Sequence, residues 1–221
     1  MPETLVLVPG LACTRALFEP QIAALGARRE IFVADHTRDD TMAAIAARLL
    51  AAAPERFALA GLSMGGYIAL EVVRQAPERA TRLALLDTNA VADTQERRQL
   101  REKQIALSRS GRFGEVMEEI WRKAVHPRRL RDAALRGIYD AMTEETEPET
   151  FIRQIRAIMG RRDSRPNAAH DRRSHARARG RRGQTDPARA GGASASPGKT
   201  FKSCGATSSP RALRLARRPI R

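Results

Sequence analysis

Apolar and polar residues follow one another in regular blocks along the first 90 residues of the chain. Short runs in which nearly every position is apolar are typical of strands buried on both faces of a parallel sheet. Between them, apolar residues recur at helical spacing. We expect strands at 4–8, 31–34, 57–60 and 83–86, and helices at 17–25, 41–53 and 64–76. This order predicts an α/β fold, a parallel sheet flanked by helices and joined by right-handed crossovers.

From about residue 93 the pattern becomes helical only. We expect helices near 93–110, 113–125, 129–142 and 148–159, with breaks at glycine and proline. These helices form either an insertion over the sheet or a bundle beside it. We therefore divide the chain into an α/β core at 1–92, a helical cap at 93–159 and a tail at 160–221.

The tail has a different composition from the rest of the chain. Residues 161–221 hold 17 of the 40 Lys and Arg residues but only 3 of the 25 Asp and Glu residues, and few large apolar side chains. Such a segment buries too little surface to offset its ordering entropy. We expect it to be disordered and to supply no C-terminal strand, which leaves the strand at 83–86 as an exposed edge of the sheet.

The positive charge suggests one alternative function, a basic-tailed protein that binds anions or nucleic acid. A lone basic run contacts phosphates without sequence specificity and in a salt-dependent way. Phe201 is the single aromatic residue in the tail that could stack on a base. We therefore expect no specific nucleic-acid partner.

Targeting and cofactor signals are not evident. Cys13 and Cys204 form neither a metal-binding spacing nor a disulfide framework. The first residues do not resemble a signal peptide, and no apolar stretch approaches the roughly 20 residues that a spanning helix needs. We expect a cytoplasmic protein without a metal, a cofactor or a membrane partner.

The most informative motif runs from Gly61 to Gly66 and has the form G-x-S-x-G, between an expected strand and an expected helix. A serine on such a tight turn has its hydroxyl exposed above the sheet, and crowding requires glycine two positions before and after it. Ser63 is therefore the candidate nucleophile, with Gly61 and Gly65 at the crowded positions. The alternative is a glycine-rich turn without chemistry.

A second turn, at Pro9-Gly10, leaves the first strand at the same end of the sheet. The backbone N–H of Leu11 in this turn and that of Met64 at the helix start can converge on one oxyanion. The alternative is an ordinary Pro-Gly turn. Cys13 has no evident base nearby, and we expect it to pack as a small apolar residue.

Four segments of the chain form a recognisable set of motifs: Leu7-Val8-Pro9-Gly10-Leu11, Gly61-Leu62-Ser63-Met64-Gly65-Gly66-Tyr67, Gln75-Ala76-Pro77-Glu78-Arg79 and Leu83-Ala84-Leu85-Leu86-Asp87-Thr88. Through these motifs, residues 4–160 resemble the small bacterial α/β-hydrolases with a helical cap, a group of esterases, enol-lactonases and proline-iminopeptidase-like enzymes. The resemblance implies a serine hydrolase that forms an acyl-enzyme on Ser63 from a small ester, lactone or related acyl substrate. A non-catalytic, degenerate hydrolase remains the alternative.

The resemblance also implies an acid and then a histidine after the serine, and here the chain departs from the family. We interpret His36 as a surface loop residue and His126 as a helix-terminus residue, while His170 and His175 lie in the basic tail. Asp87 ends the fourth expected strand, where it either caps the local backbone or serves as an acid. The triad acid and histidine are therefore not assigned.

A shifted reading frame accounts for this departure. Codons permitted for residues 170–190, read one base later, can encode Thr-Thr-Ala-Val-Pro-Thr-Leu-Val-Leu-Val-Gly-Asp-Glu-Asp-Lys-Leu-Thr-Pro-Pro-Glu-Leu. That sequence contains a buried strand followed by Gly-x-x-Asp, the acid motif that the resemblance implies. We therefore interpret the tail as a frameshifted C-terminus.

Overall fold

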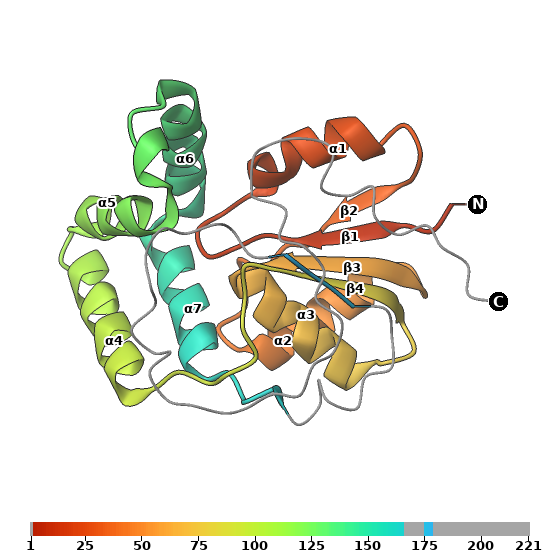
Figure 1. Cartoon of the computed structure of the whole chain (residues 1–221). Helices are drawn as coiled ribbons and strands as arrows, with labels where there is room; N and C mark the ends of the chain where they lie inside the picture. The colour runs from red at the N-terminus through yellow and green to blue at the C-terminus, as the bar shows by residue number, and fades with distance from the viewer. Residues whose placement is uncertain (1, 166–174, 179–221) are drawn as a thin grey trace, which may run out of the picture.

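A parallel sheet with the strand order β2-β1-β3-β4-β5 forms the centre of the computed structural model, which describes residues 2–165 and 175–178 (Figure 1). Every pair of neighbouring strands is parallel. The expected four N-terminal strands are confirmed. The strands are β1 (Leu5–Val8), β2 (Ile31–Val33), β3 (Phe57–Leu62), β4 (Ala80–Leu86) and β5 (His175–Ala178).

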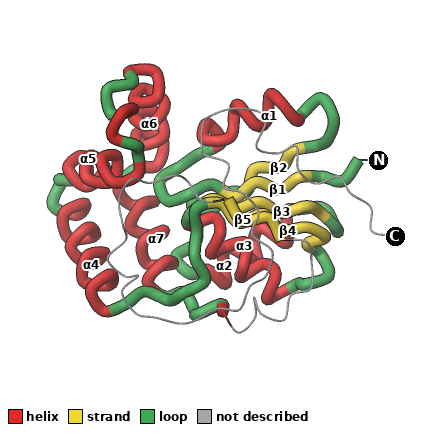
Figure 2. The backbone as a smooth tube through the Cα atoms, viewed as in Figure 1, coloured by secondary structure: helices red, strands yellow, loops and turns green. Residues whose placement is uncertain are grey.

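Helices cover both faces of the sheet, as the apolar strands require. On β1, Leu5 and Leu7 pack toward α1, whereas Val6 and Val8 pack toward α2 and α3, because successive side chains of a strand point to opposite faces. Figure 2 shows α1 on one side of the strands and α2 and α3 on the other. The helices are η1 (Arg15–Phe18), α1 (Glu19–Leu25), α2 (Met42–Ala52) and α3 (Met64–Gln75).

The register of the strands brings their following loops together. Val8 pairs with Gly61 at the ends of β1 and β3, and Leu62 pairs with Leu86 at the ends of β3 and β4. In a parallel sheet all strands end at the same edge, here called the carboxyl edge. The loop after β1, the turn after β3 and the loop after β4 therefore meet there.

The four helices after β4 gather on the side of the sheet where the strands end (Figure 1). They pack on the loop after β1 through a cluster that includes Ala12, Met117 and Phe151. The third expected helix begins later than the pattern predicts, because Pro127 starts a short 3-10 helix and Asp132 caps the next one. The elements are α4 (Gln95–Arg109), α5 (Phe113–Ala124), η2 (Pro127–Arg129), α6 (Ala133–Thr146) and α7 (Pro148–Met159).

The prediction that the tail supplies no strand is wrong at residues 175–178. These residues form β5, which pairs with β4 from Leu83 opposite His175 to Leu86 opposite Ala178. The physical reason is that β4 offers a free row of backbone N–H and C=O groups, which any extended segment can pair with. The strand at 83–86 is therefore not an exposed edge over these four residues. The remainder of the tail from residue 166, including His170 and Cys204, lies outside the described residues.

Candidate active site

Ser63 occupies a strained turn between β3 and α3. Its backbone has φ 53° and ψ −111°, a conformation that residues other than glycine rarely adopt. The end of β4 holds this turn, since the Ser63 N–H donates to the Leu86 carbonyl at 2.9 Å and the Thr88 hydroxyl donates to the Ser63 carbonyl at 2.7 Å. The fold thus presents a half-buried serine at the carboxyl edge, in a conformation that its neighbours stabilise.

Backbone strain is concentrated at this edge of the sheet. Of the four described non-glycine residues with positive φ, three lie here: Ala12 (52°), Ser63 (53°) and Asp87 (41°) follow β1, β3 and β4 respectively, and the fourth, Glu147 (56°), precedes α7. Strained backbone of this kind persists only where the surrounding structure fixes it, and it clusters at functional sites. The three loops that meet at the carboxyl edge therefore mark the candidate active site.

Two glycines allow the close approach that the turn needs. A Cβ on Gly61 would lie 2.2 Å from the Gly65 carbonyl oxygen, and a Cβ on Gly65 would lie 2.0 Å from the Val8 carbonyl oxygen. Atoms cannot approach so closely without displacing the backbone. The prediction that these two positions must lack a Cβ is confirmed, and the contact with Val8 places the start of α3 against the end of β1.

The β1 loop, defined here as residues 9–13, lies beside the Ser63 turn. A Cβ on Gly10 would stand 3.5 Å from the Leu62 carbonyl oxygen, so the two segments are in contact. The Cys13 N–H donates to the Gly10 carbonyl at 3.2 Å and closes a tight turn around Leu11. The structure therefore brings Leu11, Ser63 and Met64, the three residues expected in the site, to neighbouring positions at the carboxyl edge.

The expectation that His36 is a surface loop residue is wrong. Its side chain is only 2% exposed, and its Nε2 lies 2.9 Å from the Gly10 carbonyl oxygen. Burial lowers the pKa of His36, although the Gly10 carbonyl and the Asp35 carboxylate act in the opposite direction. His36 is thus a neutral, buried group that contacts the β1 loop.

The other candidates are His126, His175 and Asp87. His126 caps η2, where its Nδ1 accepts the Arg128 N–H, so its interpretation as a helix-terminus residue is confirmed. His175 lies in β5, where only its backbone is described. Asp87 is exposed directly after β4. Among the histidines whose side chains the structure describes, His36 and His126, neither is hydrogen-bonded to Ser63.

Cys13 behaves as a packed residue. Its thiol donates to the Leu11 carbonyl at 3.4 Å, and burial raises its pKa to about 11. A thiol with such a pKa stays protonated at neutral pH and is a poor nucleophile. This agrees with the expectation that Cys13 packs as a small apolar residue.

Helix α7 contributes two contacts that sequence reasoning missed. The buried Gln154 side chain accepts the Ala12 N–H through Oε1 at 3.0 Å, and the Arg153 guanidinium donates to the Thr37 carbonyl at 2.9 Å. One helix thus contacts the loops after β1 and β2. A signal was present, because Gln154 is a polar residue on the apolar face that α7 forms with Phe151, Ile155 and Ile158.

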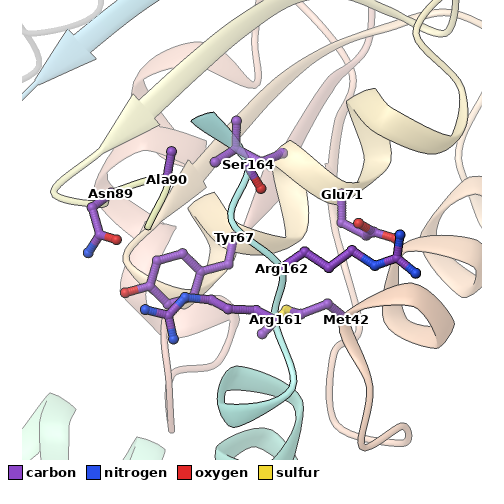
Figure 3. Close-up of a pocket in the computed structure, with 9 residues that line it drawn as sticks. Met42, Tyr67, Glu71, Asn89, Ala90, Arg161, Arg162 and Ser164 are labelled. Carbon is purple, nitrogen blue, oxygen red and sulfur yellow. The ribbon is translucent and has the colours of Figure 1, made fainter. Parts of the chain in front are cut away.

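The two ends of the helical segment 95–159 are tied together by one buried carboxylate. Asp93, just before α4, pairs with Arg101 at 2.5 Å and with Arg161 at 2.8 Å, just after α7. The Arg161 guanidinium also lies over the Tyr67 ring, 4.2 Å from its centroid (Figure 3). Asp93 and Arg161 therefore anchor both ends of this segment beside α3.

Two other kinds of site are absent from the described residues. No helix of the described residues is long and apolar enough to cross a membrane. Within the same residues, no three His, Cys, Asp or Glu side chains gather to form a metal site.

No protein-family model and no curated protein matches the chain by sequence. Solved structures do match it. An esterase from Thermogutta terrifontis aligns at 21% identity with a TM-score of 0.67, over 81% of this chain and 72% of the esterase. A hydrolase from Pseudomonas aeruginosa aligns at 21% identity with a TM-score of 0.69, over 80% of this chain and 71% of that protein.

An enol-lactonase from Burkholderia xenovorans aligns at 20% identity with a TM-score of 0.66, over 80% of this chain and 72% of the lactonase. Identities near 20% establish a shared architecture. The strand order, the crossover helices and the helical segment beyond the carboxyl edge agree with that result. The chain therefore has the α/β-hydrolase fold.

Proposed function

We propose that this chain is a serine hydrolase that acts on a small ester, lactone or related acyl compound. The observation that carries the proposal is the strained backbone of Ser63 between a parallel strand and the start of a helix. A serine on such a strand-turn-helix junction is the nucleophile elbow of α/β-hydrolases. The crowding at Gly61 and Gly65 supports this assignment, because it shows why the turn needs its G-x-S-x-G sequence.

In the proposed reaction Ser63 Oγ attacks the carbonyl carbon of the substrate, and negative charge develops on the carbonyl oxygen. The Met64 N–H lies in the first turn of α3, where N–H groups have no acceptor within the helix and the helix dipole is positive. The Leu11 N–H from the β1 loop is the second donor. Two such donors stabilise the oxyanion, the alcohol leaves, and water then hydrolyses the acyl group from Ser63.

Neither His36 nor His126, the histidines whose side chains the structure describes, is hydrogen-bonded to Ser63, and this limits the expected rate of acylation. A serine hydroxyl without an adjacent base is a weak nucleophile at neutral pH. Its proton passes to solvent in this chain, so the oxyanion donors and substrate binding supply only residual catalysis. We therefore expect slow acylation of Ser63 and ester turnover near background.

The proposed partner is a small acyl compound, without a cofactor, a membrane or a specific nucleic acid. The helices α4 to α7 lie beyond the carboxyl edge, where they would cover a substrate bound at Ser63. In this arrangement the helical segment selects the substrate, and the loops of the sheet perform the chemistry.

The test is covalent labelling with a fluorophosphonate probe, which reacts with activated serines. We expect labelling of Ser63 that Ser63→Ala abolishes and that the control Ser110→Ala, at the exposed end of α4, leaves unchanged. Peptide mapping identifies the modified residue. A probe that labels other serines equally, or that fails to label Ser63, would contradict the proposal.

A further inference from the structure

Two buried polar side chains from distant parts of the sequence contact the β1 loop. His36, 2% exposed, follows β2, and Gln154, 1% exposed, lies on α7. His36 Nε2 lies 2.9 Å from the Gly10 carbonyl oxygen, and Gln154 Oε1 accepts the Ala12 N–H at 3.0 Å. A buried polar group costs free energy unless it is hydrogen-bonded. The structure therefore ties both side chains to this loop.

The two hydrogen bonds act on the two peptide units that flank Leu11. One holds the C=O of the Gly10–Leu11 peptide, and the other holds the N–H of the Leu11–Ala12 peptide. A peptide unit is planar and trans, so its N–H points opposite to its C=O. Fixing the Gly10 carbonyl therefore fixes the direction of the Leu11 N–H.

We propose that His36 and Gln154 are positioning residues that aim the Leu11 N–H at the oxyanion. This inference rests on the proposed function, which makes Leu11 and Met64 the oxyanion donors. Neither side chain has to touch the substrate, because each acts through the backbone of the β1 loop. A hydrogen bond to the Gly10 carbonyl also polarises the peptide and strengthens its N–H as a donor.

A third hydrogen bond connects the sequence neighbours of the two positioning residues. Thr37 follows His36 and Arg153 precedes Gln154, and the Arg153 guanidinium donates to the Thr37 carbonyl at 2.9 Å. The β1 loop, the loop after β2 and helix α7 therefore form a closed ring of backbone and hydrogen bonds. Such a ring resists the movement of any one member, which is what a preorganised oxyanion donor requires.

The protonation state of His36 fits this role. Burial lowers its pKa, so the imidazole is neutral at pH 7 and carries one N–H. Since the Gly10 carbonyl can only accept, that proton lies on Nε2. Gln154 accepts its hydrogen bond from the adjacent residue, Ala12, which holds φ 52° and needs external support to stay in that conformation.

The experiment compares two disruptive variants with two controls. His36→Leu and Gln154→Met keep the approximate shape but remove the hydrogen bond, whereas His36→Gln retains a donor near the position of Nε2. Gln104→Met is the matched control, since Gln104 is a buried glutamine on α4 whose side-chain oxygen has no hydrogen-bond partner among the described residues. For each variant we measure the maximal rate of fluorophosphonate labelling of Ser63, the probe concentration at half-maximal rate, and amide hydrogen exchange across residues 9–13.

We expect His36→Leu and Gln154→Met to lower the maximal labelling rate roughly 10-fold to 100-fold, the scale of a misplaced catalytic donor, with little change in half-saturation. Hydrogen exchange of the β1 loop should rise in the same two variants. His36→Gln should recover most of the rate, and Gln104→Met should resemble the unchanged protein. A rate loss in Gln104→Met as large as that in Gln154→Met, or no recovery in His36→Gln, would overturn the positioning role.

The two readouts separate this inference from the proposed function. If Ser63 of the unchanged chain is not labelled, the proposed function fails. Amide hydrogen exchange across residues 9–13 then still shows whether His36 and Gln154 fix the conformation of the loop. If Ser63 is labelled but the rate is the same in all variants, the proposed function stands and the positioning role is refuted. Unchanged exchange across residues 9–13 also refutes it.

Discussion

The Thr88 hydroxyl donates a hydrogen bond to the main-chain carbonyl of Ser63 at 2.7 Å. The Thr88 methyl group also limits the space next to α3, since a Cβ on Gly66 would stand 2.4 Å from it. A single residue after β4 thus both bonds to the strained turn and packs against the helix that follows it. The geometry of Ser63 therefore depends on the neighbouring strand as well as on its own sequence motif.

Replacing Thr88 with valine tests this dependence, because valine keeps the shape and removes the hydroxyl. The Ser63 carbonyl still accepts the Gly66 N–H at 3.0 Å, so we expect a loss of about 1 kcal/mol in the free energy of unfolding. Urea denaturation measures this loss. Fluorophosphonate labelling of Ser63 should slow as well. Thr143→Val, which removes a hydroxyl bonded to the Tyr139 carbonyl in α6, is the control and should leave labelling unchanged.

A second prediction concerns Gly65, whose missing side chain lets the start of α3 touch β1. In Gly65→Ala the new Cβ would stand 2.0 Å from the Val8 carbonyl oxygen, which is backbone and cannot rotate away. We expect a loss of more than about 3 kcal/mol in stability, seen as low soluble yield and a lower urea midpoint.

Gly137→Ala is the matched control for this substitution. Gly137 lies in α6 with no atom within 4 Å of the position of a Cβ. Alanine is a better helix former, so we expect a gain of about 0.5–1 kcal/mol in stability. Equal effects of the two substitutions would show that helix propensity, and not the contact with Val8, determines the result.

The strands, most of the helices and the residues of the Ser63 turn could be predicted from the sequence, because apolar runs and the glycine spacing are local signals. The burial of His36 could not. Its neighbours Asp35 and Thr37 are polar, so the segment has the pattern of a surface loop. The imidazole is buried by the folded chain, where it contacts Gly10, 26 residues earlier, and no local pattern encodes that contact.

Strand β5 was missed for a different reason. The composition of the tail gives no strand signal, and its four residues carry no apolar run. What determines their extended conformation is the unpaired side of β4, a property of the assembled sheet. Tertiary pairing here overrides local preference.

A third prediction uses the pKa of His36, which burial lowers from its ordinary value of 6.5. Below pH 6.5 the unfolded chain binds a proton at this histidine that the folded chain resists. The contribution of His36 to stability is therefore complete above pH 6.5 and is lost as the pH falls through its lower folded pKa.

We test this by urea denaturation of the unchanged protein and of His36→Gln at pH 7.5, 6 and 5. Glutamine does not titrate, and the carboxylates titrate equally in both proteins. As the pH falls, the unfolding free energy of the unchanged protein should therefore decrease more than that of His36→Gln. Parallel pH profiles of the two proteins would contradict the assignment of a buried, neutral imidazole.

The final prediction concerns the reading frame of the tail, and β5 gives it a structural basis. Residues His175–Ala178 pair in parallel with β4. The codons permitted for the same four residues, read one base later, can encode Thr-Leu-Val-Leu. An interior strand of a parallel sheet is expected to be apolar, as β1 and β3 are. The sheet thus places a strand at the four positions where the shifted frame supplies the sequence for one.

We therefore expect the gene, sequenced from codon 160 onward, to contain an open second frame that encodes Thr-Leu-Val-Leu at codons 175–178, valine at codon 179 and Gly-x-x-Asp at codons 180–183. In a protein expressed with that frame restored, the aspartate would follow β5 at the carboxyl edge, on the side of β4 away from β3. Such an acid activates a serine only through a histidine, so the acceleration requires that the restored frame also encodes a histidine further on. With both residues present, fluorophosphonate labelling should become at least roughly 100-fold faster. Stop codons in the second frame, or polar residues at codons 175–178, would show that the basic tail is the true sequence. The short pairing with β4 would then be a property of this chain alone.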